Sequence, residues 1–341
     1  MKIETFNRFV SFAAPYHVEV KREKRPAPPA GQVLVKTRLS AISPGTEMLV
    51  YRGQLPKDIP LDASIAALQQ TNGYPMKYGY ACIGQVIALG AGVPAEWLER
   101  MVFAFNPHEA YFVARLQDVL PIPDGLPLED AVFLPNMETA INLVQDGAPL
   151  LGERVAIFGQ GIVGLLTAAL LAYFPLERLV TFDRYPRRRQ ASLEVGAHAS
   201  LDAERAHFEP ILPGGADLTF ELSGAPAVLD AAIAATGFAG RIVIGSWYGE
   251  KRAALNFGGA FHRSRIRILS SQVSTIAPQL TGRWDKSRRF ALAWEMLRQI
   301  RPARWVTHRF EIGEAARAYA QIDQCPEDTL QVLLTYMPEG G

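Results

Sequence analysis

Short apolar runs alternate with alanine- and leucine-rich stretches over the middle of the chain. Runs rich in β-branched residues predict strands, and the stretches between them have the length and composition of helices. Strands that alternate with helices at this spacing indicate a parallel, doubly wound α/β sheet. The predicted strands span 154–158, 178–182, 217–222, 241–245 and 265–272, and the predicted helices span 162–173, 187–195 and 227–236.

The first third of the chain has a different pattern, with short β-rich runs separated by turns rich in proline and glycine. Strands are predicted at 33–37, 83–89, 101–105 and 111–114, and a helix at 128–145. After the α/β section, the pattern predicts a helix at 287–301, a strand at 305–310, a helix at 313–322 and a strand at 330–336. We expect these last strands to return to the first domain. The predicted domains are therefore 1–145, completed by about 286–341, and 146–285.

Composition and charge exclude several classes of protein. Of the 341 residues, 49% are hydrophobic and 20% are charged, so the chain can bury a sizeable core. The net charge of +1 provides no general attraction for nucleic acid or an anionic membrane. The long apolar stretch at 155–176 is interrupted by three glycines, which favours a buried strand, turn and helix over a membrane span.

The two cysteines, Cys82 and Cys325, form neither a CxxC pair nor a zinc-ligand spacing. Residues 1–10 carry charged and polar side chains and lack the apolar core of a signal peptide. We therefore expect a cytoplasmic protein, in a reducing compartment.

A glycine-rich turn is the clearest chemical motif. The apolar run 155–158 precedes Gly159-Gln160-Gly161-Ile162-Val163-Gly164, and a helix follows. Gly159 permits the tight turn, Gly161 lets the backbone approach a pyrophosphate, and Gly164 lets the helix pack on the strand. Because the motif follows a strand, opens a helix and is followed by an acidic residue at the end of the next strand, it predicts a dinucleotide-binding site.

The acidic residue is Asp183, whose carboxylate can accept hydrogen bonds from the ribose hydroxyls of NAD. Arg184 follows at once and Arg188 lies nearby, and arginines at this place can hold the additional phosphate of NADP. The sequence favours NAD and leaves NADP open.

Several segments resemble the medium-chain dehydrogenase/reductase superfamily over almost the whole chain. Residues 41–47 (AISPGTE) look like the segment that usually carries Cys-Gly-Thr/Ser-Asp, and 78–86 (YGYACIGQV) like the place of its Gly-His-Glu. Residues 307–310 (THRF) are similar to a strand near the family's C-terminus. The resemblance implies an α/β fold: a Rossmann doubly wound parallel sheet plus an N-terminal β-rich GroES-like catalytic domain.

The chain departs from the family's zinc pattern at each ligand. Pro44 stands at the cysteine, Tyr80 at the histidine, Ala81 at the glutamate and Pro135 at the last ligand. A catalytic zinc needs about three protein ligands, and two cysteines cannot form the family's four-cysteine structural site. We therefore predict that the protein binds no zinc.

A narrower resemblance is to the zinc-free branch that contains 3-hydroxyethyl bacteriochlorophyllide a dehydrogenase. It is carried by residues 42–47, 51–53, 74–75 and 79–80, and by the segments 223–226 (SGAP) and 245–248 (GSWY). Ser223 and Gly245, at the starts of these last two segments, are expected to contact the cofactor. Thr139 matches a family position that packs on the nicotinamide, and the less favoured alternative is an ordinary helix threonine.

Without zinc, a hydrogen-bonding group must stabilise the substrate oxygen. Thr46 matches the family's proton-relay hydroxyl. Tyr80 occupies a former ligand position, where it either donates to the developing oxyanion or fills the vacated space. Glu47 and Lys77 are candidates for acid/base roles or structural ion pairs. His108 is either a proton relay or a surface-loop histidine.

The predicted activity is the NAD(P)-dependent interconversion of a secondary alcohol and a carbonyl. A conjugated or aromatic substrate suits a zinc-free site, because its ring stabilises the developing positive charge. One alternative is an enone or quinone reductase using NAD(P)H, and another is a dinucleotide-binding subunit without turnover. We expect a small-molecule substrate, no nucleic-acid or membrane partner, and a homodimer.

Overall fold

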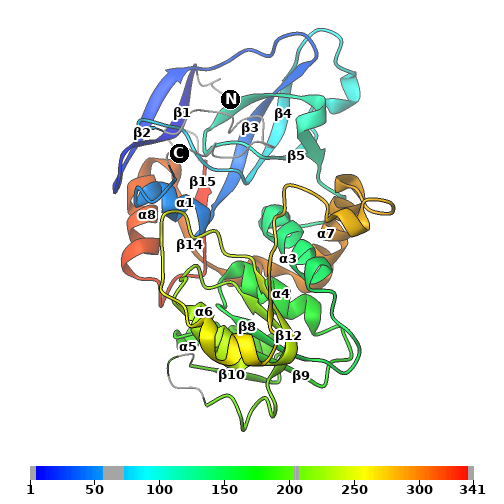
Figure 1. The fold of residues 1–341 in the computed structure, drawn as a ribbon. Coiled ribbons are helices and arrows are strands. Elements are labelled where there is room, and N and C mark those ends of the chain that lie inside the picture. Colours follow the sequence, from blue (N-terminus) through cyan, green and yellow to red (C-terminus); the bar gives the residue numbers. More distant parts are fainter. Residues whose placement is uncertain (1–4, 57–72, 203, 205–206, 337–341) are drawn as a thin grey trace. The chain divides into compact units, whose positions relative to one another are not determined.

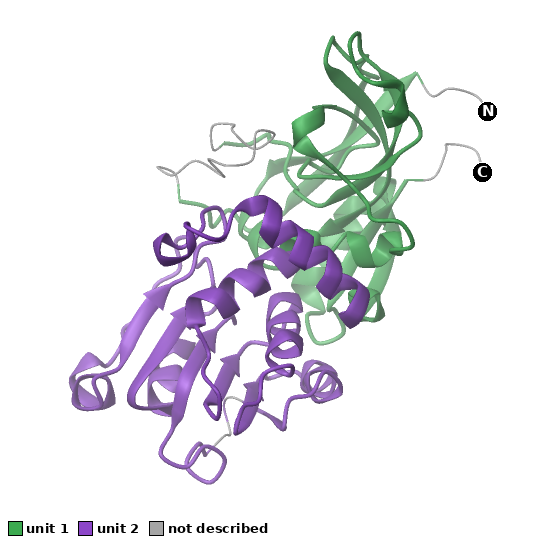
Figure 2. Ribbon diagram, turned by 90° about the vertical axis from the view of Figure 1, so that its right-hand side faces the viewer, with its two compact units in different colours: residues 1–135, 301–341 green, residues 136–300 purple. Residues whose placement is uncertain are grey.

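The computed structural model describes residues 5–56, 73–202, 204 and 207–336. Within them the chain forms two compact units, residues 1–135 with 301–341, and residues 136–300 (Figure 2). The domain boundaries expected near 145 and 285 thus differ from the observed divisions, which follow residues 135 and 300, by about the length of one helix each. In the described part of the chain, no helix is long and apolar enough to cross a membrane.

The first unit is built on antiparallel strands, with a parallel pair at one edge. A seven-stranded sheet has the order β14-β15-β3-β4-β5-β7, with β6 also paired to β3, and β1 and β2 form a separate hairpin (Figure 1). The strands are β1 (Phe6–Ala14), β2 (His17–Lys24), β3 (Gln32–Ile42), β4 (Cys82–Leu89), β5 (Met101–Ala104), β6 (Tyr111–Arg115), β7 (Val119–Pro121), β14 (Val306–Glu311) and β15 (Gln331–Thr335).

The C-terminal segment completes this sheet, as expected. β15 pairs antiparallel with β3, placing Val332 opposite Ile42. Helix α8 (Ala315–Gln324) buries Tyr319 in a core shared with β1 and with α1 (Thr46–Tyr51), where the Tyr319 ring packs against Phe12 and Tyr51. Residues more than 270 positions apart therefore share one hydrophobic core.

The second unit contains a six-stranded parallel sheet with the order β10-β9-β8-β11-β12-β13. Buried strands such as β8 are apolar throughout, because a parallel sheet is covered on both faces. The elements are β8 (Arg154–Phe158), β9 (Arg178–Phe182), β10 (Ala199–Leu201), β11 (Ala216–Glu221), β12 (Thr236–Ile244), β13 (Arg267–Ser270), α3 (Leu134–Gly147), α4 (Ile162–Leu171), α5 (Pro186–Glu194), α6 (Val228–Ala235) and α7 (Lys286–Ile300).

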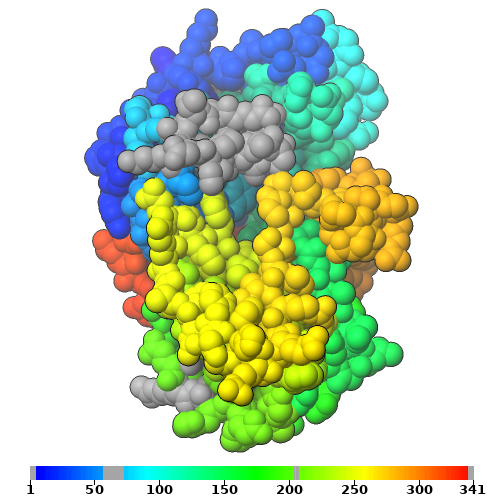
Figure 3. Space-filling view, in the orientation of Figure 1, coloured from blue at the N-terminus to red at the C-terminus, as the bar shows by residue number. Residues whose placement is uncertain are grey.

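The chain leaves β8, crosses to β9 on one side, and later returns to β11 on the other side. The order of the strands therefore reverses between β8 and β11, which is the place where ligands bind in open α/β sheets. In the space-filling view, the yellow segment between α6 and β13 forms much of the visible surface of the second unit (Figure 3).

Several sequence predictions need correction. The single helix expected at 128–145 is two helices, α2 (Leu128–Ala131) and α3, because Pro135 has no N–H for a continuous helical ladder. Strands β1, β2, β7 and β10 were not expected, and β12 begins five residues earlier than expected. Most of the unassigned segment 54–72 lies outside the described residues.

Candidate active site

The glycine-rich turn connects β8 to α4 and has the geometry that a dinucleotide requires. Gly159 has a φ of +92°, and a Cβ there would lie 2.5 Å from the Ser223 amide nitrogen. A Cβ on Gly164 would lie 2.0 Å from the Gly159 carbonyl oxygen. A Cβ on Gly161 would meet no atom within 4 Å. Two glycines are therefore needed for the fold itself, whereas Gly161 leaves its space open to a ligand.

The N-terminus of α4 begins at this open space. Gly161 is the N-cap, and it has no side chain to satisfy the N–H groups of the first turn, which includes Ile162 and Val163. The free N–H groups and the helix dipole together attract anions. The turn therefore provides the chemistry to hold the pyrophosphate of a dinucleotide.

Asp183 follows β9 and braces the turn from the side. Its Oδ2 accepts from the Gln160 amide at 2.8 Å and its Oδ1 accepts from the Tyr185 amide at 2.9 Å. The side chain is buried, so the carboxylate fixes the glycine-rich turn in addition to the expected contact with a ribose. Each carboxylate oxygen has two lone pairs, and acceptor capacity remains for ribose hydroxyls.

The two arginines expected near Asp183 gather around one aromatic ring. The guanidinium carbons of Arg184 and Arg188 lie 4.7 and 4.8 Å from the centre of the Tyr185 ring. Burial lowers the pKa of Arg188, and the Asp183 carboxylate opposes this shift. Positive charge thus lies beside the Asp183 carboxylate. The carboxylate could bind the ribose of NAD, and the arginines could bind the additional phosphate of NADP.

The carboxyl end of β11 carries a buried carboxylate that sequence analysis did not single out. Glu221 accepts from the Ser223 amide at 2.8 Å, from the Ser223 hydroxyl, and from the Tyr248 hydroxyl at 2.5 Å. Burial and the Glu221 charge raise the pKa of Tyr248, which keeps its phenol protonated. The position of Glu221 at the end of a predicted strand was the signal that could have identified it.

The remaining cofactor candidates differ in their surroundings. A Cβ on Gly245 would lie 2.5 Å from the Leu143 side chain, so a larger residue here would displace that side chain. Ser223 follows β11 and donates hydrogen bonds to Glu221 from its amide and its hydroxyl. Thr139 is half-buried on α3, one position after the buried Glu138.

In the first unit, Glu47 and His108 form a buried pair. Both side chains have no exposed surface, and Glu47 Oε2 lies 2.9 Å from His108 Nε2. Glu47 Oε1 also accepts from the Ser43 amide at 2.9 Å. The expectation of a surface-loop histidine is therefore wrong, because His108 lies in the interior, where a Cβ on Gly79 would lie 2.6 Å from its ring.

The pair belongs to a longer hydrogen-bonded chain. Tyr319 donates to Glu47 Oε2 at 2.5 Å, His108 Nδ1 lies 2.7 Å from Ser40 Oγ, and Ser40 Oγ lies 2.7 Å from the Tyr336 hydroxyl. Burial, followed by the Glu47 charge, raises the pKa of Tyr319, so this phenol acts as a donor. If Glu47 is ionised and His108 is neutral, each group from Tyr336 through Ser40 and His108 donates a hydrogen bond to the next, and Glu47 is the final acceptor.

The loop 43–46 is anchored by this network. Glu47 holds the Ser43 amide, and the Ser43 hydroxyl accepts from the Thr46 amide at 3.3 Å. Thr46 itself is half-buried, as is Tyr80, whose ring packs edge-on against Tyr78 with centroids 6.4 Å apart. The structure thus brings Glu47 and His108 together as supports of the segment that carries Thr46.

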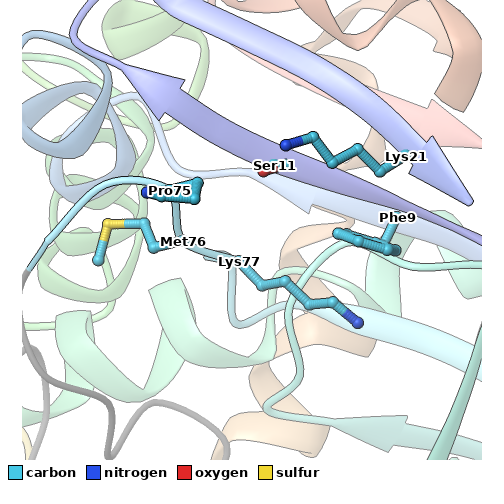
Figure 4. Close-up of a pocket in the computed structure, with 6 residues that line it drawn as sticks. All are labelled: Phe9, Ser11, Lys21, Pro75, Met76 and Lys77. Carbon is cyan, nitrogen blue, oxygen red and sulfur yellow. The ribbon is translucent and has the colours of Figure 1, made fainter. Parts of the chain in front are cut away.

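Lys77 lies beside a hollow of about 450 Å³ in the first unit, lined by Phe9, Ser11, Lys21, Pro75, Met76 and Lys77 (Figure 4). Its Nζ is 2.8 Å from Glu23, 3.1 Å from Glu109 and 3.9 Å from the centre of the Phe9 ring. Burial lowers the pKa of Lys77, but the two carboxylates outweigh it and raise the pKa overall. The Lys77 ammonium group is therefore a charged ion-pair partner. Of the two roles expected for Lys77, this agrees with the structural ion pair.

The residues at the family's zinc-ligand positions do not fit a metal. Pro44, Ala81 and Pro135 offer no side-chain donor, and Tyr80 is a neutral phenol unless deprotonated. The nearby Glu47 and His108 already bond to each other. Among the described residues, no group of three or more His, Cys, Asp or Glu side chains could hold a metal ion.

A comparison with known families gives a match in the second unit. A family model described as zinc-binding dehydrogenase matches residues 163–291, from the first turn of α4 into α7. This part of the chain is similar to the zinc-binding dehydrogenase family. The match begins within the glycine-rich turn, after Gly159 and Gly161, and it also leaves out residues 44, 80, 81 and 135.

Individual relatives extend this likeness to the whole chain. The starvation-sensing protein RspB of Escherichia coli is 22% identical over 94% of this chain and 97% of its own length. The (R,R)-butanediol dehydrogenase of Bacillus subtilis is 27% identical over 70% of this chain and 77% of its own. A crystal structure of an alcohol dehydrogenase (rspB) from E. coli complexed with NADH has a TM-score of 0.78, at 19% identity, covering 98% of this chain and all of that one.

These likenesses confirm the expected fold, a Rossmann sheet with a GroES-like domain, and several of the relatives are dehydrogenases. The zinc-free branch stays a prediction. Sequence reasoning missed Ser40, Tyr319 and Tyr336, because no local motif marks them and they reach Glu47 and His108 only through the tertiary fold.

Proposed function

We propose that the protein is a zinc-independent, NAD(P)-dependent oxidoreductase that interconverts a secondary alcohol and a carbonyl on a conjugated or aromatic small molecule. The glycine-rich turn carries this proposal, because Gly161 leaves open space at the N-terminus of α4 while Gly159 and Gly164 lock the turn around it. The dehydrogenase relatives support the reaction class.

The absence of zinc is inferred from the donor set and from the way its neighbours are used. Three of the four family ligand positions carry side chains without a donor atom, namely Pro44, Ala81 and Pro135. A conjugated ring next to the carbinol carbon would stabilise the charge that develops as hydride leaves. Such a substrate needs less assistance from a Lewis acid.

A bound nicotinamide accepts or supplies the hydride of this reaction. The protein's own groups must hold the substrate oxygen and move its proton. In the oxidation direction, the Thr46 hydroxyl takes the proton of the substrate alcohol and passes one on to solvent. Tyr80 donates a hydrogen bond to the substrate oxygen as negative charge develops on it. The Glu47–His108 network keeps the 43–46 loop in place for this step.

NAD is the preferred cofactor in this proposal. The Asp183 carboxylate retains acceptor capacity for two ribose hydroxyls and repels a phosphate. Arg184 and Arg188 beside Tyr185 leave binding of NADP as the competing outcome.

A substrate panel tests the reaction class. Secondary alcohols, including hydroxyethyl-substituted aromatic compounds, are offered with NAD⁺ and NADP⁺, and ketones, enones and quinones are offered with NADH and NADPH. We expect turnover on aryl or conjugated secondary alcohols and their ketones. Turnover on enones or quinones alone would contradict the proposal and indicate an enone or quinone reductase. Cofactor binding without any turnover would contradict it and indicate a non-catalytic subunit.

Replacing Tyr80 by phenylalanine removes only the proposed donor. Loss of one oxyanion donor lowers kcat by about 100-fold or more, and we expect this loss with little change in stability. Tyr74→Phe is the matched control, because the Tyr74 hydroxyl donates to the Val50 carbonyl. A Tyr80→Phe enzyme with the kcat of the wild type would show that Tyr80 only fills space.

We further propose a cytoplasmic homodimer that pairs through β13. This strand ends the six-stranded sheet, and Leu269 on it and Phe238 on the adjacent β12 are exposed. The mass in solution should be that of two chains of 37.5 kDa. Replacing Leu269 by lysine should shift the mass to that of one chain, and a monomeric wild type would contradict the proposal.

A further inference from the structure

Helix α7 carries an arginine that is completely buried. The Arg289 side chain has no exposed surface, and it lies in the same unit as the glycine-rich turn. Burying a guanidinium is costly unless its charge and its N–H groups all find partners. The hydrogen-bond partners of Arg289 therefore show which parts of the structure this buried charge holds in place.

One partner neutralises the charge. Glu138 on α3 is also buried, and its Oε1 accepts from Arg289 Nε at 3.1 Å and from Nη2 at 2.9 Å. Lys286, one turn earlier on α7, donates to the same oxygen at 2.7 Å. Asn142 Oδ1 accepts from Arg289 Nη1 at 2.5 Å. The fork of Arg289 thus joins α7 to two positions on α3.

The other partners are backbone carbonyls of the segment 271–275, which follows β13. Arg289 donates to the Val273 carbonyl and, at 3.4 Å, to the Thr275 carbonyl. Lys286 donates to the Val273 carbonyl at 2.7 Å. Ser271, at the start of the segment, donates to Asp146 Oδ2 at 2.6 Å. The segment is therefore fixed to α3 and α7 at several points.

The location of this segment relates it to one half of a dinucleotide. All six strands are parallel, so the residues after β13 lie at the same edge of the sheet as the glycine-rich turn. Asp183, the partner of the adenosine ribose, follows β9 on one side of the turn. The other half of the dinucleotide must then extend across β11 and β12 toward β13, which brings the nicotinamide to 271–275 and to Thr139.

A nicotinamide carboxamide both donates and accepts hydrogen bonds, so it requires backbone groups at fixed positions. Carbonyls held by Arg289 fix the orientation of their peptide groups. The Ser274 amide, which shares a peptide group with the Val273 carbonyl, donates to Gln272 Oε1 at 2.6 Å and fixes the segment further. A buried ion pair is a poor source of stability, whereas the rigid fork of an arginine sets geometry well.

We propose that Arg289 is a positioning residue that, with Glu138 and Lys286, holds 271–275 in the conformation that binds the nicotinamide half of the cofactor. This inference rests on the proposed dinucleotide site. It predicts that Arg289 affects the binding of the nicotinamide half of the cofactor and leaves the binding of the adenosine half unchanged.

The test compares NADH with ADP-ribose, which has the adenosine and both phosphates but no nicotinamide. Binding of each is measured on the full chain, by NADH fluorescence and by calorimetry. In Arg289→Lys, which keeps the charge but loses the fork, we expect NADH to bind about 10-fold more weakly. ADP-ribose should bind within about twofold of the wild type.

Arg241→Lys is the matched control at the opposite edge of the same sheet. Arg241 on β12 donates to the Gly147 and Ala148 carbonyls and pairs with Glu153 at 2.7 Å, so it has the same kind of partners away from the cofactor edge. Its replacement should lower Tm without changing the ratio of the two affinities. Lys286→Met provides a milder variant, because Lys286 is partly exposed, and should weaken NADH selectively by a smaller factor.

Equal weakening of both ligands in Arg289→Lys, or no weakening of either, would overturn the inference. If Arg289→Lys does not fold, an unchanged ratio in Lys286→Met would overturn it. A wild-type chain that binds neither ligand would refute the proposed dinucleotide site and this inference with it.

Discussion

Gly161→Val should lose cofactor affinity while keeping its fold. Gly161 has φ −70° and ψ −174°, which any residue adopts, and its Cβ would meet no atom within 4 Å. The added side chain would instead occupy the space through which a pyrophosphate approaches the first turn of α4. We expect NADH to bind about 100-fold more weakly, equivalent to about 2.7 kcal/mol, measured by fluorescence titration.

The stability of this variant separates a blocked site from a damaged fold. Tm of Gly161→Val should remain close to that of the wild type, because a Cβ at this position meets no protein atom within 4 Å. Gly164→Ala is the contrasting variant, since its Cβ would lie 2.0 Å from the Gly159 carbonyl oxygen and the turn would have to shift. A Gly161→Val protein with wild-type affinity for NADH would show that the cofactor does not bind at this turn.

Glu47→Leu should have the largest effect on stability. It leaves three buried donors without their acceptor: the Ser43 amide, His108 Nε2 and the Tyr319 hydroxyl. A buried donor left without its acceptor typically costs about 1–3 kcal/mol, so with three such donors we expect the free energy of unfolding to fall by about 3–5 kcal/mol. Urea-induced unfolding of the two proteins measures this difference.

An exposed carboxylate provides the control for this experiment. Glu129 pairs with Arg309 at the surface of the same unit, and Glu129→Gln should cost no more than about 1 kcal/mol. Tyr319→Phe removes one of the three donors and should fall between the two. If Glu47→Leu unfolded at the same urea concentration as Glu129→Gln, the network would not be the anchor of the 43–46 loop.

The second unit was predicted closely from the sequence, because its signals are local. Strands β8 and β9 were predicted at the bounds the structure gives them, and the glycine-rich turn between β8 and α4 was located residue by residue. A parallel sheet covered on both faces produces continuous apolar runs. The hairpin of β1 and β2 was missed, because half of β2 is exposed and carries the charged run 21–24.

The site in the first unit was predicted only in part, because its partners are distant in the sequence. Glu47 and His108 were selected as separate candidates, and no pattern indicated that they form one pair. Tyr319 reaches Glu47 across 272 positions, through packing of α8 on α1 and β1. Such contacts depend on tertiary structure, which local periodicity does not encode.

Hydride transfer without a metal is tested most directly by measuring turnover and zinc content on the same preparation. We predict steady turnover of a conjugated secondary alcohol when zinc is far below one ion per chain, with no change on adding a chelator or zinc. Activity that rises in proportion to bound zinc, and is lost on chelation, would contradict the proposed roles of Thr46 and Tyr80.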